Sequence, residues 1–548
     1  MMKQKILLGL VTLVGTLVAL NFFSGFDSSL ARALITPAAA AEQDHDGPST
    51  QVQKAHCGAH DSPETGLQGQ IPMPDRLGGF KGFNCNLEMT TATSASRGNG
   101  LWQQFAAVRD RAGHLCGYAG GTFFSSNPGT VVVDLTDPKH SVETEILKTP
   151  GMITPGEGLR AHTGRGLLAS ANYQIAPSND SIAHGFDLYD VGTDCRHPKL
   201  LVSTTSIEFD TTGLPPFPGK GPWPNPDKIY GHEGAFSPDG MTYYISDSPH
   251  AVYHAIDISD PSKPKLLATL QDPILVRSTP MTITGGPHGL SISNDGKRGY
   301  FTSNDVDLTS PSGATSPTSR NGFFIVDTSQ IQARKPKPKM PVISRGAWSD
   351  GTGEQMTIPV SIKGRHYLIT TEEGGAGQFN TKGERFACSQ GRIPFGIARI
   401  HDIENEKSPR QIAKIILETN DPANCAIFDP EIGAVNGFIY DVHMCSVDNR
   451  DEATTLACGY FQSGIRVYDI RDPKQIKEIA YYIPPAKSAG IGGIMTSTGP
   501  GVCAAIPILD AASGMLYSSC ADIGVVSLKF DPRVWPFPQS KTPPDRQL

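Results

Sequence analysis

The chain has 548 residues, a formal net charge of -7 and only 18% charged residues, and it contains 58 glycines and 44 prolines. This composition argues against long exposed helices and favours many short strands joined by turns. The negative charge, with no long run of lysine and arginine, argues against nucleic acid as a partner.

The first 41 residues have the organisation of an export signal. "MMKQK" is positively charged, "ILLGLVTLVGTLVALNFF" is apolar, and "TPAAAAEQ" supplies small residues near Ala41. We therefore expect a signal peptide at 1–41 and a periplasmic or secreted protein. The apolar stretch is also long enough to be a membrane anchor if it is not cleaved. Residues 42–75 are polar, and we expect a flexible lead-in there, before a main domain at 76–548.

All ten cysteines follow the signal, at positions 57, 85, 116, 195, 388, 425, 445, 458, 503 and 520. An even number in an exported chain favours disulfides, and the absence of any C-x-x-C pair argues against a thioredoxin-like or zinc-ribbon protein. Two pairings are expected between adjacent strands, Cys445 with Cys458 and Cys503 with Cys520.

One sequence element recurs along the chain: an apolar strand that ends in aspartate, then a turn, then often Asp-Pro. "VVVDLTDPKH", "HAIDISDPSKPK" and "RVYDIRDPKQ" are examples, and "VVSLKFDP" is a degenerate last copy. The aspartate and the following proline are typical of tight turns. The aspartates of the six clear copies are Asp134, Asp190, Asp257, Asp327, Asp402 and Asp469.

A second element precedes most copies and has the pattern of a hairpin. "FSPDGMTYYISDS" and "SISNDGKRGYFTSN" each place an Asp-Gly turn between two short strands. A hairpin plus two further strands makes a unit of four strands, and such units stack radially. We therefore predict an all-β fold, a β-propeller with seven four-stranded blades.

The strands "VVVDL", "FIVDT", "AIDIS" and "VYDIR", each followed by this turn, resemble LVIVD-repeat proteins over roughly residues 100 to 530. The resemblance implies the propeller architecture. It implies no catalytic residue, because most of that family has no assigned function.

Four histidines occupy the start of the first strand of a blade, which lines the channel of a propeller. They are His162 in "LRAHTGRG", His232 in "GHEGAF", His288 in "GPHGLS" and His443 in "DVHMCS". Four imidazoles that converge there would bind iron, copper or zinc. A similar set of four histidines holds iron(II) in the carotenoid oxygenases, another propeller family, which is a likeness of geometry and not of sequence. The alternative is that these histidines only bond to neighbouring backbone.

Acidic residues near these positions are candidate catalytic groups, and they would also hold the second nitrogen of an imidazole. They are Glu157, Glu233 and Glu373, with Glu372 and Asp441 as further candidates for the second role. A solvated loop is the alternative for the pair in "TTEEGG". The chain contains no G-x-S-x-G, H-E-x-x-H or P-loop motif.

A proline-rich stretch, "PPFPGKGPWPNPDKIYGHEG", stands directly before His232. It would cover the channel mouth and offer Phe217, Trp223 and Tyr230 to an apolar small molecule, or it would serve only as a rigid spacer. The sequence thus predicts an exported enzyme with a metal site in the channel and a small-molecule substrate. A metal-dependent oxidoreductase leads, a hydrolase or lyase comes second, and a non-catalytic binding scaffold is the alternative.

Overall fold

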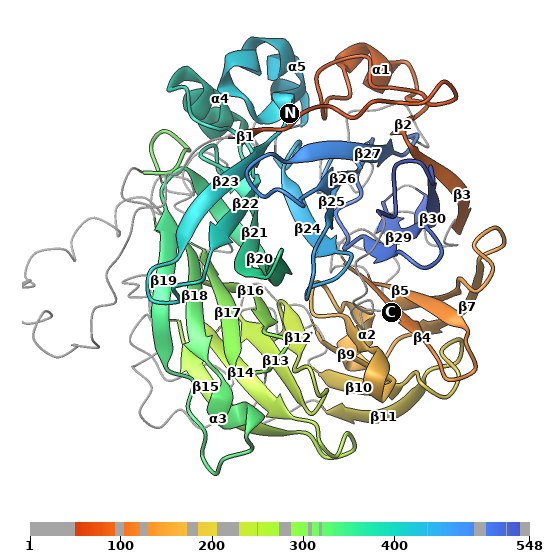
Figure 1. The fold of residues 1–548 in the computed structure, drawn as a ribbon, viewed down its shortest axis with the longest axis vertical. Coiled ribbons are helices and arrows are strands. Elements are labelled where there is room, and N and C mark those ends of the chain that lie inside the picture. The colour runs from red at the N-terminus through yellow and green to blue at the C-terminus, as the bar shows by residue number, and fades with distance from the viewer. Residues whose placement is uncertain are drawn as a thin grey trace, which may run out of the picture. The chain divides into compact units, whose positions relative to one another are not determined.

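The computed structural model describes residues 50–93, 104–120, 129–172, 185–204, 229–248, 250–272, 286–304, 310–316, 320–435, 437–486, 500–521 and 523–537. In this part of the chain seven sheets, whose four main strands are antiparallel, stand around a central axis, which confirms a seven-bladed β-propeller (Figure 1). The predicted signal peptide lies outside the described residues.

The first four blades follow chain order, and each runs from an inner to an outer strand. Blade 1 is β4 (Gln104–Arg109), β5 (Leu115–Gly120), β6 (Thr130–Asp134) and β7 (Val142–Leu147). Blade 2 is β8 (Arg160–His162), β9 (Leu167–Ala171), β10 (Phe186–Asp190) and β11 (Lys199–Thr204). Blade 3 is β12 (Gly234–Phe236), β13 (Thr242–Asp247), β14 (Val252–Asp257) and β15 (Lys265–Gln271). Blade 4 is β16 (Gly286–Ile292), β17 (Arg298–Asn304), β18 (Asn321–Asp327) and β19 (Val342–Trp348).

The last three blades also include strands from the N-terminal part of the chain. Blade 5 is β20 (Gly351–Ile362), β21 (Arg365–Gly375), β22 (Ala398–Asp402) and β23 (Arg410–Ile416), with β1 (Thr50–Gln51) at its edge. Blade 6 is β24 (Val442–Val447), β25 (Thr455–Tyr460), β26 (Ile465–Asp469) and β27 (Lys477–Ile483), with β2 (Phe83–Cys85) at its edge. Blade 7 is β28 (Ile508–Asp510), β29 (Met515–Cys520), β30 (Gly524–Phe530) and β3 (Leu87–Thr93).

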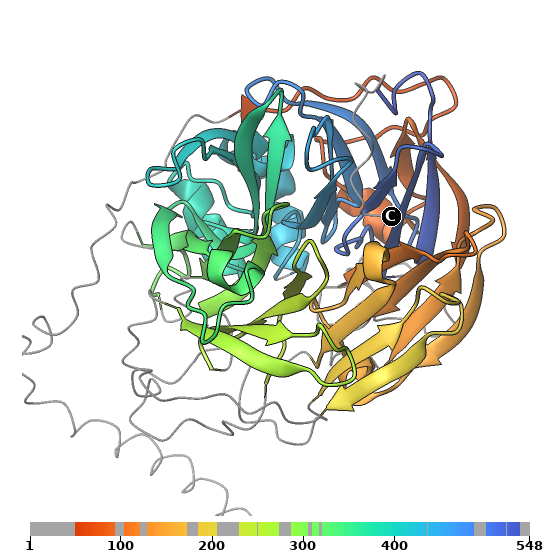
Figure 2. The ribbon, with the colours of Figure 1, turned by 60° about the horizontal axis from the view of Figure 1, so that its bottom comes forward.

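The ring closes where β3 pairs with β30, so that the N-terminal strand is the outermost strand of the last blade. Figure 2 shows this contact as one red-brown strand beside blue ones. We expected a flexible lead-in at 42–75, but from Thr50 onward the chain is ordered against the propeller. There the chain pairs with blade 5 and buries Val52, because this segment covers sheet edges that would otherwise expose unpaired backbone groups.

Helices are short in the described part of the chain, and none of those found there is long and apolar enough to cross a membrane. The α-helices are α1 (Met73–Leu77), α2 (Pro150–Ile153), α3 (Ser329–Gln332), α4 (Thr381–Ser389) and α5 (Cys425–Val435). Three 3₁₀ helices are η1 (Thr163–Arg165), η2 (Glu418–Asn420) and η3 (Pro422–Asn424).

The recurring aspartate ends the third strand of its blade and caps the turn that follows. The Oδ1 of Asp190, for example, accepts a hydrogen bond of 2.9 Å from the backbone N–H of Gly192. Asp134, Asp257, Asp327, Asp402 and Asp469 make the same bond to the residue two positions later. The repeat is therefore a turn device, as the sequence predicts for an aspartate at a strand end.

The hydrophobic core lies between neighbouring blades. Tyr244 of blade 3 and Phe301 of blade 4, for example, are both buried in one cluster, and Tyr253 stacks on Phe301 with 4.6 Å between ring centroids. Apolar side chains on both faces of each sheet are buried in this way, which leaves the inner strands free to line the axis.

Five disulfides cross-link the fold. Both predicted pairs are present, and Cys445 and Cys458 are directly opposite each other on β24 and β25. The others are Cys57–Cys85, Cys116–Cys195 and Cys388–Cys425.

Candidate metal centre

Three histidines and two glutamates from five blades meet at one end of the inner strands. His232 directly precedes β12, His288 lies in β16 and His443 lies in β24. Glu157 precedes β8, and Glu373 lies near the end of β21. The sequence analysis named all five of these residues.

Local irregularities of the strands aim two of these histidines at the centre. The pairing register shifts between Pro287 and Leu290 in β16, and between Val442 and Cys445 in β24. His288 and His443 lie inside these two shifts. A β-bulge of this kind turns a side chain away from the regular alternation of a strand.

His232, His288 and Glu157 form one group of possible metal ligands, and all three are buried. Nε2 of His232 lies 2.9 Å from Nε2 of His288. The same Nε2 of His232 lies 3.2 Å from Oε2 of Glu157. This Oε2 atom is buried and makes no hydrogen bond, although an imidazole nitrogen is so close.

His443, Glu157 and Glu373 form a second group. Nε2 of His443 lies 3.1 Å from Oε1 of Glu157 and 2.9 Å from Oε1 of Glu373. The second oxygen of Glu373 lies 3.4 Å from Nε2 of His288, which connects the two groups. Glu373 is the most accessible of the five, with 12% of its side chain exposed.

Backbone carbonyls fix the other nitrogen of two imidazoles. Nδ1 of His443 lies 2.7 Å from the oxygen of Ala504, and Nδ1 of His288 lies 3.3 Å from that of Gln355. Because a carbonyl only accepts hydrogen bonds, Nδ1 donates in each case. The Nε2 atoms are therefore oriented toward the carboxylates, as in histidines that bind metals. Neither carbonyl could be anticipated from the sequence, because backbone groups leave no signal in it.

The electrostatic balance at this point favours positive charge. Burial alone would lower the pKa of His443, but the hydrogen bonds that its imidazole donates to the carboxylates of Glu157 and Glu373 raise it to about 10. Burial would raise the pKa of Glu157, but His232 and His443 hold it well below its ordinary value. The pKa of Glu373 is lowered in the same way by His288 and His443, against the effect of burial. The carboxylates thus stabilise a cation here, either a proton on an imidazole or a metal ion.

A glycine beside His288 allows the close packing of the site. A Cβ atom on Gly289 would lie 1.9 Å from the carbonyl oxygen of Gln355 and 2.3 Å from Oε2 of Glu233. The carbonyl of Gln355 is backbone and cannot move aside as a side-chain end could, so only glycine fits. This explains the glycine that follows His288 in "GPHGLS".

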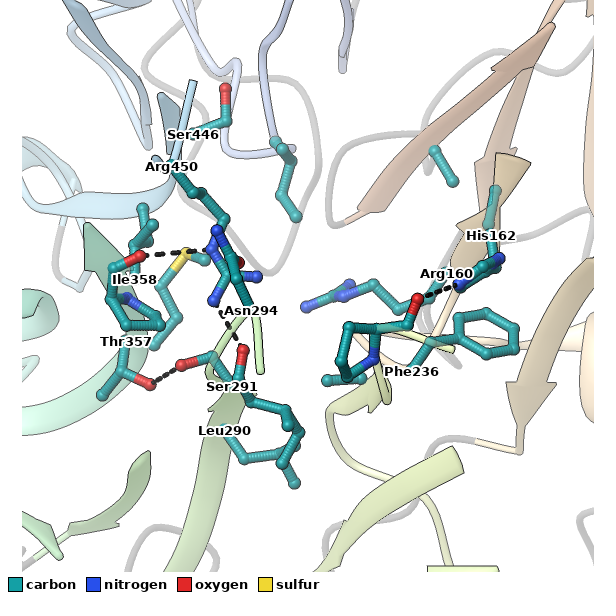
Figure 3. A pocket seen from close by; sticks show the side chains of 18 of the residues that line it. Arg160, His162, Phe236, Leu290, Ser291, Asn294, Thr357, Ile358, Ser446 and Arg450 are labelled. Carbon is teal, nitrogen blue, oxygen red and sulfur yellow. Dashed lines mark hydrogen bonds between the residues drawn. The ribbon is translucent and has the colours of Figure 1, made fainter. Parts of the chain in front are cut away.

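The prediction that His162 belongs to this site is wrong. Its Nε2 lies 3.1 Å from the carbonyl oxygen of Pro238, and its Nδ1 accepts a hydrogen bond from the backbone N–H of Arg165 (Figure 3). His162 thus lies beside Pro238, which follows His232 by six residues in blade 3. It is therefore farther along the channel than His232. In blade 2 the residue at the level of His232 is Glu157, because its backbone forms an isolated β-bridge with Glu233 of blade 3.

Beyond these five residues, a cavity of about 660 Å³ follows the axis. Residues of all seven inner strands or their ends line it, with apolar walls that include Phe236, Leu290 and Ile358. Arg160 and Arg450 approach it from opposite sides (Figure 3). Arg450 donates to the carbonyls of Pro359 and Ile292 and so braces blades 4, 5 and 6.

Glu233, a predicted catalytic residue, lies between the metal centre and this cavity. It is fully buried, and its Oε1 lies 2.6 Å from a guanidinium nitrogen of Arg160. Burial raises its pKa to about 7 in spite of Arg160. It belongs to neither ligand group, so it is a neighbour of the centre and not one of its ligands.

The other predicted positions have different surroundings. Tyr230 is buried with its ring 5.0 Å from that of His250, so it packs inside blade 3 and is not presented to a ligand. Phe217 and Trp223 lie outside the described residues. Glu372 pairs with the buried Arg399, and Asp441 accepts hydrogen bonds from backbone N–H groups, so neither holds an imidazole.

The donor set fits a divalent transition-metal ion. Imidazole nitrogen and carboxylate oxygen together suit iron(II), manganese(II) and zinc(II). This differs from the predicted set of four histidines, because two carboxylates replace one imidazole. The buried oxygen of Glu157 without a hydrogen bond is the atom that a bound ion would satisfy.

Comparisons with known proteins bear on the fold. No protein-family model and no curated protein matches the chain, so the resemblance to LVIVD-repeat proteins stays a prediction. A candidate 6-phosphogluconolactonase from Bacteroides uniformis is 11% identical, with a TM-score of 0.46 over 77% of this chain and 93% of its own. Hydrazine synthase from Kuenenia stuttgartiensis is 12% identical, with a TM-score of 0.45 over 80% and 97%. The periplasmic gluconolactonase of Pseudomonas aeruginosa is 11% identical, with a TM-score of 0.42 over 73% and 96%. Likeness at this level concerns the fold alone and says nothing about activity.

Proposed function

We propose that this protein is a metal-dependent enzyme that acts on a small molecule at the end of the propeller channel, with an oxidoreductase as the leading class. The observation that carries the proposal is the buried convergence of His232, His288 and Glu157 from three blades. Two imidazoles and one carboxylate are the ligand set of non-haem iron(II) oxygenases. An ion bound there would supply Lewis-acid and redox chemistry that protein side chains lack.

A purely structural role explains this arrangement less well. Burying two carboxylates among three imidazoles is costly unless each charge is compensated. The binding-scaffold alternative predicts scattered histidines, whereas three of the four predicted ones converge. Among the described residues, large exposed apolar side chains such as Val142, Met241 and Phe386 belong to different elements and do not indicate a docking face.

A metal-dependent hydrolase is the second candidate. The accessible carboxylate of Glu373 lies beside the ligand group and would accept a proton from a water molecule bound near it. The metal would distinguish the two classes, because zinc supports hydrolysis but no redox chemistry. Export to an oxidising compartment agrees with the five disulfides and is part of the same proposal.

The experiment is metal analysis of the exported, untagged protein and of two variants. His288→Ala removes a proposed ligand, and His162→Ala is the matched control from the same channel. We expect at least one equivalent of iron, manganese or zinc in the wild type and in the control, and less in His288→Ala. Equal metal content in all three folded proteins, or none after reconstitution, would overturn the proposal.

A second measurement tests the reaction class. Nitric oxide, an analogue of oxygen, should bind the iron(II)-loaded protein and give an EPR signal if the iron has an open position. A metal-loaded protein without that signal would favour the hydrolase.

A further inference from the structure

The five donor residues divide into two groups that share one member. Glu157 belongs both to the group with His232 and His288 and to the group with His443 and Glu373. The proposed function takes its metal ligands from the first group only. Two members of the second group are as buried as the first group. The side chain of His443 is fully inaccessible, and that of Glu157 is 1% exposed.

The second group has the dimensions of a coordination sphere. Metal–ligand bonds to nitrogen and oxygen are about 2.0–2.2 Å long, so neighbouring donors of one ion lie about 2.8–3.4 Å apart. In the second group, Nε2 of His443 lies 3.1 Å from Oε1 of Glu157 and 2.9 Å from Oε1 of Glu373. Both separations are in this range.

The two carboxylates each point one oxygen at each group. Oε2 of Glu157 lies 3.2 Å from His232, whereas its Oε1 lies 3.1 Å from His443. Oε2 of Glu373 lies 3.4 Å from His288, whereas its Oε1 lies 2.9 Å from His443. Carboxylates that face two donor groups in this way are the bridges of two-metal sites, whose ions lie about 3.5–4 Å apart.

Among the described residues, the ion pairs of Glu157 and Glu373 are with histidines only, namely His232, His288 and His443. The guanidinium of Arg160 pairs with Glu233 and with neither of these two carboxylates. An ion at His443 would place positive charge directly beside Oε1 of Glu157 and Oε1 of Glu373, the two carboxylate oxygens nearest to its Nε2.

We infer that the centre holds two divalent first-row ions, one at His232 and His288 and the other at His443, bridged by Glu157 and Glu373. This inference rests on the proposed function, because the first ion is the one proposed there. A two-ion centre would let a substrate bind through two oxygens, one on each ion, which a single ion with three protein ligands does less well.

The test is a count of manganese ions and of their coupling. The wild-type protein is stripped with a chelator, reloaded with excess Mn²⁺ and desalted, and manganese is measured per chain. We expect about two equivalents in the wild type and in His162→Ala, and about one in His443→Ala. EPR of the wild type should show the exchange-coupled spectrum of two bridged Mn²⁺ ions, and His443→Ala should show an isolated ion.

The outcomes separate the two proposals. One equivalent in the wild type, with an uncoupled spectrum and no loss in His443→Ala, overturns the second ion and leaves the proposed function intact. No bound manganese in the wild type, and none with iron(II) or zinc(II), overturns both. If His443→Ala does not fold, the wild-type stoichiometry and spectrum decide by themselves.

Discussion

Oε1 of Glu157 and Nε2 of His443 lie 3.1 Å apart, although 286 residues separate them in the sequence. The pair connects the segment before β8 of blade 2 with β24, the inner strand of blade 6, across the channel. An ion bound between them would cross-link distant parts of the ring in the native state alone, because the unfolded chain does not bring them together.

Removing metal should therefore lower the stability of the protein. At a free metal concentration of a hundred times Kd, the free energy of unfolding is raised by about 3 kcal/mol. Thermal unfolding with and without a chelator measures the change in Tm, which reloading should restore. The His288→Ala variant should lose much of this shift. An unchanged Tm in wild-type protein that has demonstrably lost its metal would contradict the prediction.

Much of the fold could be predicted from the sequence, because its signals are local. The aspartate at each third strand makes a hydrogen bond only two residues away, as Asp190 does to Gly192, so the pattern repeats within a short window. The Cys445–Cys458 and Cys503–Cys520 pairs follow from hairpins for the same reason. The segment from Thr50 was misjudged because its partners lie more than 300 residues later, as in the pairing of Thr50 with Ile415.

The site could be predicted only as far as it depends on which residues stand at the start of an inner strand. His232, His288 and His443 were found because each stands where an inner strand begins. The prediction fails for His162 because this residue is the last of β8, whereas Glu157, which precedes that strand, lies at the level of the site. His162 stands 28 residues before the aspartate of its blade, Asp190, and the corresponding spacings for His232 and His443 are 25 and 26. This difference is too small to show that His162 lies at another level of the channel.

Gly289→Ala should damage the metal centre through sterics alone. The new methyl group would lie 1.9 Å from the carbonyl oxygen of Gln355 and must displace the β-bulge that carries His288. Overpacking of this kind costs about 1–3 kcal/mol, and we expect metal affinity to fall with it. Gly158→Ala is the matched control, since its Cβ would meet nothing closer than 3.4 Å. Thermal unfolding and metal content measure both effects, and equal behaviour of the two variants would refute the steric explanation.

The aspartate turns should each contribute measurable stability. The carboxylate of Asp190 accepts hydrogen bonds from the N–H groups of Gly192 and Thr193 and from the hydroxyl of Thr193. Asp190→Ala removes all three and should lower the free energy of unfolding by about 1–2 kcal/mol. Asp190→Asn keeps an acceptor oxygen at the same place and should cost less than half as much. Chemical denaturation compares them, and equal losses would show that the turn does not depend on this acceptor.

The disulfides should differ in their contributions. Cys116 and Cys195 are 79 residues apart and join two blades, whereas Cys445 and Cys458 are 13 residues apart within one blade. Loop-closure entropy therefore predicts that replacing both cysteines of the first pair by alanine costs about 1–2 kcal/mol more than replacing the second. Denaturation of the two double variants measures the difference. A greater loss for Cys445–Cys458 would show that native packing outweighs chain entropy.

The free energy of unfolding should depend on pH through Glu64, which lies in the segment before the first blade. The buried Arg466 pairs with both Glu64 and Glu478, so two carboxylates share one guanidinium. Burial, together with the charge of Glu478, raises the pKa of Glu64 to about 7 in spite of Arg466. Gly69 donates its N–H to Glu64, and the hydroxyl of Tyr481 accepts the N–H of Glu64.

The sign of the effect follows from the raised pKa. Between the unperturbed value of about 4.5 and about 7, native Glu64 keeps a proton that the unfolded chain has released. Its contribution to stability is thus complete below pH 4.5 and is lost as the pH rises through 7. Glu64→Gln stays neutral at every pH, so the stability of the wild type relative to this variant should fall by about 1–3 kcal/mol between pH 5 and 8. Chemical denaturation across this range measures it, with the exposed Glu88→Gln as the control. A difference between wild type and Glu64→Gln that does not change with pH would show that Arg466 keeps both carboxylates ionised.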